Sequence, residues 1–207
     1  MNKIAVIDYG MGNLHSVSKA LEKVTDRYSI LITSNKSEIN EAEKIVIPGV
    51  GAIGDCKKAL DKVGLDKVVK ENVLSKPTLA ICVGMQLFLE SSEESGGTEC
   101  LGLFDGHIER LPQKSEIKVP HMGWNLVKQT SDHPMWKNIP DSSYFYFVHS
   151  YCCKDSNQAV GKTKHGIEFV SAIAKDFIFA VQFHPEKSQS IGLQLYKNFI
   201  EWNGAVE

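Results

Sequence analysis

Residues 79–86 read Leu-Ala-Ile-Cys-Val-Gly-Met-Gln, and this stretch decides the fold. A short apolar run that ends at a turn residue is typical of a buried strand, and Met85 to Glu90 predicts the start of a helix. Small residues stand two places before and two places after Cys82, the pattern of a sharp turn that lifts a nucleophile clear of a sheet. A helix N-terminus behind this thiol favours the thiolate and leaves the Val83 amide free to donate to an oxyanion. The alternative for this stretch alone is a buried structural cysteine.

The same order of strand and then helix repeats through the first half of the chain. The pattern predicts strands over 4–7, 28–32, 44–47 and 78–81, and helical segments over 14–24, 59–63 and 65–69. Strands with two apolar faces are typical of a parallel sheet that is covered by helices on both sides. Between residues 101 and 182 the pattern favours strands, at 143–151, 168–174 and 177–182, before a last helix over 190–202.

We therefore expect an α/β fold: one domain spanning 1–207, with an open, mostly parallel sheet flanked by helices and an antiparallel extension. In such sheets the chemistry lies at the carboxyl ends of the strands.

Composition excludes several classes of protein. With 43% hydrophobic and 23% charged residues the chain resembles an ordinary globular protein. Its 23 Lys and Arg against 25 Asp and Glu leave a formal charge of −2, so we expect no nucleic-acid partner. No apolar run reaches the ~18 residues of a membrane span, and none resembles a signal peptide. The five cysteines are an odd number without a C-x-x-C pair, which predicts a cytoplasmic protein with no disulfide framework and no metal site.

A second reactive stretch is Ala180-Val181-Gln182-Phe183-His184-Pro185-Glu186. His184 and Glu186 follow an apolar strand and are two residues apart, so both side chains are expected to point the same way. The carboxylate can then hold the imidazole while the imidazole takes a proton from a thiol. A histidine beside an acid is usually a surface pair, but its position after a strand, together with the Cys82 turn, favours a catalytic role.

A third stretch is Pro48-Gly49-Val50-Gly51, which follows an apolar strand. Glycines there expose backbone N–H groups, which is what a second oxyanion donor requires. Residues 49–54 also satisfy Gly-x-Gly-x-x-Gly, the pattern of a dinucleotide site. That site needs an acidic residue at the end of the next strand about 20 residues on, whereas 66–73 has a helical pattern. A nucleotide-binding or non-catalytic module remains the alternative from a different class.

Together the three stretches resemble the class I (triad) glutamine amidotransferases over nearly the whole chain, with the flavodoxin-like fold of that family. Segments 8–14, 48–51, 121–125, 146–151 and 184–187 are similar to the glutaminase subunits of histidine biosynthesis, whose other subunit is a (β/α)8-barrel cyclase. The resemblance implies a heterodimer that needs no cofactor and hydrolyses L-glutamine. It implies that Cys82 is the nucleophile, that His184 is the base and then the acid, and that Glu186 orients His184.

The remaining roles also come from the resemblance. It implies oxyanion amides at Val83 and at Gly49, Val50 and Gly51, substrate contacts at Gln86, Ser150 and Tyr151, and a partner interface at Asn13, Trp124, Tyr146 and Lys187. The family usually has Gly where this chain has Ala80, and Leu where it has Val83.

Three further expectations concern regulation, the identity of the synthase partner, and the histidines to which no role is assigned. We hypothesise that segment 48–51 switches the oxyanion site when the partner docks. The alternative function, that of a paralogous glutaminase that serves another synthase, for example in surface-sugar amidination, remains open. His107, His121, His133 and His165 show no metal-ligand spacing, so we expect them on the surface or in loops.

Overall fold

The apolar runs of the first half pair as parallel strands in a computed structural model that describes residues 2–113 and 117–205. The parallel strands are β1 (Asn2–Ile7), β2 (Tyr28–Thr33), β3 (Lys44–Gly49), β4 (Thr78–Cys82) and β13 (Ile178–Val181). They lie in the order β2-β1-β3-β4-β13. β3 and β13 therefore flank β4 on its two sides, and the carboxyl ends of all three strands meet at one rim of the sheet.

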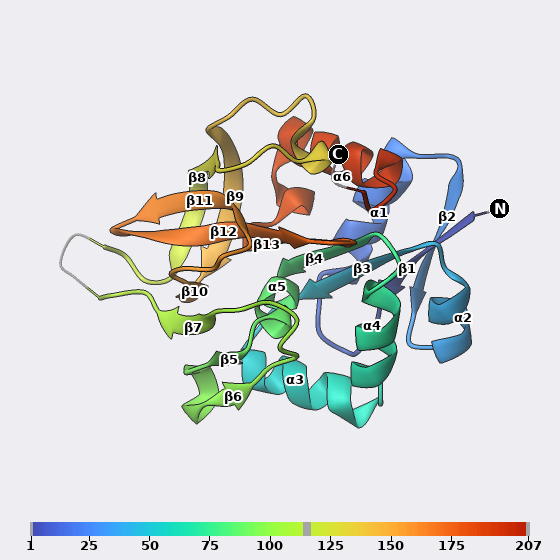
Figure 1. The fold of residues 1–207 in the computed structure, drawn as a ribbon, viewed down its shortest axis with the longest axis horizontal. Helices are drawn as coiled ribbons and strands as arrows, with labels where there is room; N and C mark the ends of the chain where they lie inside the picture. The colour runs from blue at the N-terminus through green and yellow to red at the C-terminus, as the bar shows by residue number, and fades with distance from the viewer. Residues whose placement is uncertain (1, 114–116, 206–207) are drawn as a thin grey trace.

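Helices cover both faces of these strands, as the two-sided apolar pattern predicts (Figure 1). They are α1 (Leu14–Val24), α2 (Lys36–Glu41), α3 (Ile53–Lys62), α4 (Asp66–Val73), α5 (Val83–Phe88) and α6 (Gln189–Glu201). Figure 1 shows α1 and α6 on one side of the sheet and α3 and α4 on the other. None of the helices in the described ranges is both long and apolar enough to cross a membrane.

Further strands extend this sheet, mostly in antiparallel pairs, beginning with β12 (Ile167–Lys175) against β13. The path continues through β10 (Tyr151–Cys153), β7 (His107–Arg110), β5 (Ser91–Ser92) and β6 (Thr98–Glu99). A side branch leaves β12 through β11 (Ala159–His165) to the hairpin of β8 (His121–Gln129) and β9 (Ser143–His149). Short 3-10 turns cover Glu94–Gly96, Pro134–Trp136 and Pro185–Lys187. The predicted α/β fold with an antiparallel extension is confirmed.

Several boundaries differ from the sequence prediction. The helix after Cys82 begins at Val83 rather than Met85, because the turn leads directly into the first helical residue. The expected strand over 143–151 is interrupted at Ser150, where β9 ends and β10 begins. The stretch after α5, for which no strand was predicted, contains β5 and β6, which pair with each other. The six-residue α2 was not predicted, because so short a helix carries little periodicity.

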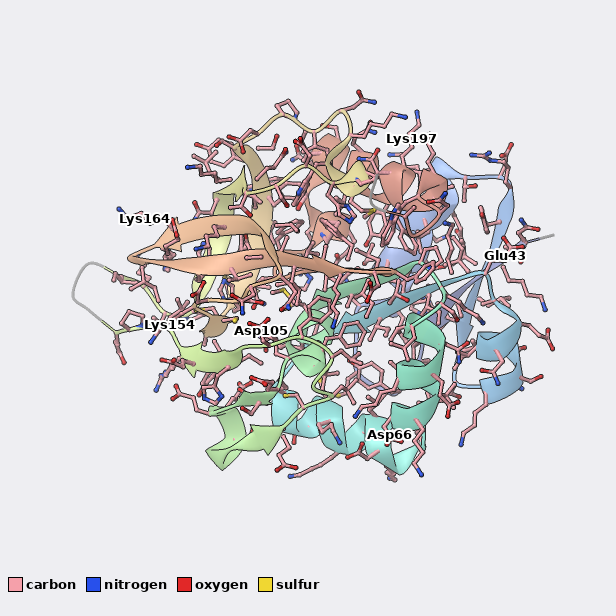
Figure 2. All side chains as sticks on the ribbon, viewed as in Figure 1. Glu43, Asp66, Asp105, Lys154, Lys164 and Lys197 are labelled. Atoms are coloured by element: carbon pink, nitrogen blue, oxygen red, sulfur yellow. The ribbon has the colours of Figure 1, made fainter. Side chains whose placement is uncertain are left out.

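Charged side chains of both signs are spread over the surface, in agreement with the small net charge. Figure 2 shows Glu43, Lys164 and Lys197 at the periphery in separate parts of the fold, and all three are exposed. The apolar side chains of the main strands instead form one core with the inner faces of the helices.

The expectation that the spare histidines lie on the surface or in loops is wrong for His121, which is buried at the start of β8; His133 lies in a loop, as expected, but is buried as well. His121 Nδ1 lies 2.9 Å from His149 Nε2, and its ring stacks on His165 at 4.0 Å. Burial, with His149 and His165 nearby, lowers the pKa of His121 to about 3. Burial lowers the pKa of His133 and of His149 to about 4. These rings are therefore neutral in the folded protein at neutral pH.

Neutral buried histidines make the fold sensitive to acid. An unfolded chain binds their protons near pH 6.5, whereas the folded chain takes them up only near pH 3 to 4, so the free energy of unfolding falls as the pH drops across this window. We expect a loss on the order of 3 kcal/mol per histidine across that window. Urea midpoints between pH 7 and 4.5 measure it.

His133→Asn is the matched variant for this measurement. His133 Nδ1 accepts a hydrogen bond from the Met135 amide, a cap that asparagine also makes without a titrating ring. The variant should lose less stability than the parent between pH 6.5 and 4.5. A pH dependence identical to that of the parent would contradict the assignment of His133 as a buried neutral ring.

Candidate active site

The Cys82 turn has the sharp backbone that the sequence predicts. β4 ends at Cys82 and α5 begins at Val83, and Cys82 has φ 57° and ψ −111°, a conformation that side-chain-bearing residues rarely adopt. A Cβ atom on Gly84 would lie 2.1 Å from the carbonyl oxygen of Ile47, so glycine lets α5 approach β3. The turn places the thiol at the end of the central strand.

The methyl group of Ala80, where the family usually has glycine, is accommodated in this sheet. Ala80 is fully buried and lies level with Ile47 on β3 and Ala180 on β13. The two strands flanking β4 continue in register to Val181 and Gly49, which are level with Ile81 and Cys82.

His184 and Glu186 follow β13, the strand beside β4. The His184 amide donates to the carbonyl of Tyr146 at 2.8 Å, which anchors the backbone after the strand. Nδ1 of His184 lies 2.8 Å from Oε1 of Glu186, and both side chains are almost fully buried. Asn13 Nδ2 donates to the same Glu186 oxygen at 3.4 Å. The carboxylate therefore holds the imidazole by one ring nitrogen.

The electrostatics of this pair favour a protonated imidazole. Burial opposes protonation, but the negative charge available on Cys82, together with the Glu186 carboxylate, outweighs it and raises the pKa of His184 to about 10. The other ring nitrogen, Nε2, is buried and has no hydrogen-bond partner in the described part of the chain. His184 can therefore share a proton with the neighbouring thiol, because its second nitrogen is already engaged by Glu186.

A hydrogen-bonded pair of glutamines lies under the thiol. Gln182 Nε2 is 3.7 Å from Cys82 Sγ, and the Val148 carbonyl is 4.0 Å from the same sulfur. Gln86 Nε2 donates to Gln182 Oε1 at 2.9 Å and to the Tyr151 carbonyl at 3.0 Å. Gln86 is thus buried and held by two protein groups, so its expected contact with substrate stays a prediction.

A cavity of about 510 Å³ opens over the thiol. Most of the predicted site residues line it, namely Asn13, Val50, Gly51, Cys82, Val83, Gln86, Ser150, Tyr151, His184 and Lys187. Gly49, at the end of β3, and Glu186, which is hydrogen-bonded to His184, are not part of the lining. Trp124 and Tyr146 are not part of the lining and lie on the β8–β9 hairpin.

Sequence reasoning missed three polar residues of this site, namely Glu94, His149 and Gln182. Glu94 is the acidic side chain of the cavity lining, and its Oε2 accepts from the Ile53 amide at 3.0 Å. It lies in a stretch whose composition indicates only a polar loop, so no pattern marks it. Gln182 had a detectable signal, because it is a polar residue in an otherwise apolar run before His184.

The predicted partner residues Trp124 and Tyr146 belong to an exposed apolar surface. Register places Trp124 opposite Tyr146 and Leu126 opposite Tyr144, so these side chains share one side of the hairpin with Met122. We call Met122, Trp124, Leu126, Tyr144 and Tyr146 the hairpin face. The side chains of Met122 and Tyr144 are 63% and 57% exposed, which is unusual for large apolar groups. Lys187 Nζ lies 5.7 Å from the centre of the Tyr146 ring and links this face to the cavity.

No group of three His, Cys, Asp or Glu side chains within residues 2–113 and 117–205 is arranged to hold a metal ion. The cavity brings together a thiol, a buried imidazole–carboxylate pair and the backbone of Val50 and Val83. That set is suited to acyl transfer through a thioester.

Comparison with known proteins agrees with this chemistry. The family model described as glutamine amidotransferase class-I matches residues 5–202. The chain belongs to the class I glutamine amidotransferases. Like them it is an enzyme, and this membership confirms the resemblance drawn from the three stretches.

Curated members of the family are similar in sequence to this chain over nearly its whole length. The imidazole glycerol phosphate synthase subunit HisH of Acinetobacter baylyi is 53% identical, covering 98% of this chain and 100% of that one. The protein of the same name from Pseudomonas putida is 53% identical over 99% of both chains.

Two solved structures share the fold with this chain at low sequence identity. PurLQS from Thermotoga maritima has a TM-score of 0.71 at 16% identity, covering 97% of this chain and 98% of that one. A glutamine amidotransferase from the same organism has a TM-score of 0.58 at 19% identity, covering 97% and 81%.

Proposed function

We propose that this amidotransferase is the glutaminase subunit of an imidazole glycerol phosphate synthase. It hydrolyses glutamine to glutamate and delivers the ammonia to a (β/α)8-barrel cyclase with which it forms a heterodimer. The observation that carries the chemistry is the buried His184–Glu186 pair beside the Cys82 thiol. The partner assignment is supported by the full-length similarity to subunits of that name.

The proposed reaction has two halves. The Cys82 thiolate attacks the side-chain carboxamide of glutamine, while the Val83 amide and the 48–51 segment donate to the oxyanion. This attack forms the C–S bond; collapse of the tetrahedral intermediate then breaks the C–N bond, and protonated His184 gives its proton to the departing ammonia. Water then attacks the thioester, His184 takes its proton, and glutamate leaves as the thiolate is restored. Glu186 keeps Nε2 as the reacting nitrogen throughout.

The cavity offers separate places for the two ends of glutamine. The reacting amide belongs beside Cys82, and we place the amino-acid head group toward Ser150, Tyr151 and Gln86. Glu94 supplies the negative charge that the substrate ammonium group requires, since it is the acidic residue of the lining.

The hairpin face is proposed as the dock for the synthase subunit, with Asn13 and Lys187 at the cavity mouth. Aromatic side chains in a patch are the usual anchors of such interfaces. We expect Trp124→Ala to weaken binding of the barrel subunit by about 2 kcal/mol, which is roughly 30-fold in Kd. Titration calorimetry measures the change.

Leu74→Ala is the matched control for that titration. Leu74 is as exposed as Met122 but lies at the end of α4, away from the hairpin. Its removal should leave Kd unchanged. Equal losses in both variants, or none in Trp124→Ala, would place the dock elsewhere.

The functional assignment is tested by assaying glutamate release from the chain alone, with the barrel cyclase, and with the cyclase plus the substrate that the cyclase turns over. Strong stimulation in the last mixture, with ammonia incorporated into product, is expected. Stimulation only by a different synthase would instead identify a paralogue, and equal rates in all mixtures would remove the proposed switch in 48–51. A chloroketone analogue of glutamine should label Cys82, which a nucleotide-binding module would not explain.

We also propose that residues 1–207 act as one domain in the cytoplasm. A single apolar core runs through the parallel and antiparallel parts. All five cysteines are free, as the reducing cytoplasm favours.

A further inference from the structure

The segment from Pro48 to Gly51 is packed tightly against the Cys82 turn. Gly49 lies level with Cys82 in the sheet. A Cβ atom on Gly49 would lie 2.6 Å from the Gly84 nitrogen and 2.8 Å from the Tyr9 hydroxyl oxygen. The backbone at Gly49 is therefore enclosed by the turn on one side and by Tyr9 on the other.

Two buried side chains donate to carbonyl oxygens of this segment. The Tyr9 hydroxyl donates to the Pro48 oxygen at 2.7 Å, and the Cys56 thiol donates to the Val50 oxygen at 3.3 Å. Tyr9 comes from the turn after β1 and Cys56 from α3, and both side chains are buried. Burial raises the pKa of Tyr9 well above its usual value and the pKa of Cys56 to about 11, so both groups keep their protons at neutral pH.

These two contacts fix alternate peptide planes. A held Pro48 oxygen fixes the Pro48–Gly49 peptide, and a held Val50 oxygen fixes the Val50–Gly51 peptide, because each peptide is a rigid plane. The Gly49–Val50 peptide lies between them. Its Gly49 end belongs to the last ladder pair of β3 with β4, opposite Cys82, and Val50, which carries its N–H, lines the cavity over Cys82. Turning this one peptide breaks only that last ladder pair, while both neighbouring peptides stay held by side chains.

We propose that Tyr9 and Cys56 are positioning residues of the oxyanion site, which clamp the two outer peptides so that the Gly49–Val50 peptide turns its N–H toward the reacting carbonyl. This inference rests on the proposed glutaminase function and adds two residues that touch no substrate. Neither residue lines the cavity. Their effect passes through the backbone of residues 48–51.

The test uses Tyr9→Phe and Cys56→Ala in the complex with the barrel cyclase and its ligand. Loss of an oxyanion donor lowers kcat by about 10² to 10³, so loss of a group that only positions the donor should lower kcat about tenfold. KM should stay within about twofold, because the oxyanion forms only after substrate has bound. Binding of the glutamine-derived aldehyde, whose thiol adduct carries an oxyanion, should weaken by the same factor as kcat/KM.

Cys153→Ala is the matched control, because its thiol also is buried and donates to a backbone carbonyl, that of Asp155 at 3.0 Å. It should keep the parental kcat, and Cys56→Ser, which retains a donor, should recover most of the activity lost in Cys56→Ala. Parental kcat in Tyr9→Phe and Cys56→Ala overturns the proposal. So does a rise in KM alone, or an equal loss in Cys153→Ala. A parental complex without Cys82-dependent glutamate release would instead refute the glutaminase function itself.

Discussion

Cys82→Ala is expected to release no measurable glutamate from glutamine while folding like the parent. The substitution removes the atom that forms the thioester, so the covalent route is lost entirely. In serine-based triads the loss of one member costs about 10⁴ to 10⁶ in kcat, and we expect a loss of that size here. Coupled glutamate assays at saturating glutamine, in the complex with the synthase subunit, measure it.

Folding should survive this change. Alanine occupies less space than cysteine, and the small side chain lost is worth on the order of 1 kcal/mol. Cys100→Ala is the matched control, because Cys100 is a partly buried thiol outside the cavity lining. It should keep the parental rate. Glutamate release by Cys82→Ala at the parental rate, in a preparation that unfolds at the parental urea midpoint, would refute the nucleophile assignment.

Gly84→Ala is expected to destabilise the fold by several kcal/mol and to abolish activity with it. The added Cβ would lie 2.1 Å from the Ile47 carbonyl oxygen, a backbone atom of the neighbouring strand that has no free space to move into. The helix and the strand must separate, and α5 carries the Val83 amide away from the thiol. Urea unfolding and glutaminase assays of the same preparation measure both losses.

Ala80→Gly is the informative comparison, because it changes the small residue on the other side of Cys82. Ala80 is packed between two flanking strands that already accommodate its methyl group. Its removal should cost on the order of 1 kcal/mol in stability and leave kcat within a few-fold of the parent. A larger loss of activity in Ala80→Gly than in Gly84→Ala would contradict this account of the turn.

The parts of the fold that the sequence predicts well depend on local rules. The strand, glycine and helix around Cys82 form a pattern of eight consecutive residues, and the alternation of apolar strands with helices predicts the parallel sheet. The pairing of His184 with Glu186 also follows locally, since two residues separate them. Their approach to Cys82 follows from the rule that parallel strands end at one rim.

The parts that were not predicted depend on contacts between distant segments. His121 is buried because β8 pairs with β9 and brings His149 against it, and nothing in residues 121–125 indicates that neighbour. Glu94 reaches the cavity because a loop after α5 folds back toward the start of α3. Cys56 is an exception, because it contacts the Val50 oxygen only six residues away, but its sequence context resembles that of any apolar helix position.

The proposed catalytic groups and the proposed docking face lie on different branches of the sheet. The groups proposed for bond breaking come from β3, β4 and β13, which are neighbours on the main path and therefore keep the fixed ladder spacing of about 4.8 Å. The hairpin face lies on the side branch of β11, β8 and β9. Substitutions on that branch can change which enzyme receives the ammonia while the strand ends that cleave glutamine stay as they are. One hydrolytic centre can thus be passed on through evolution to serve many biosynthetic routes.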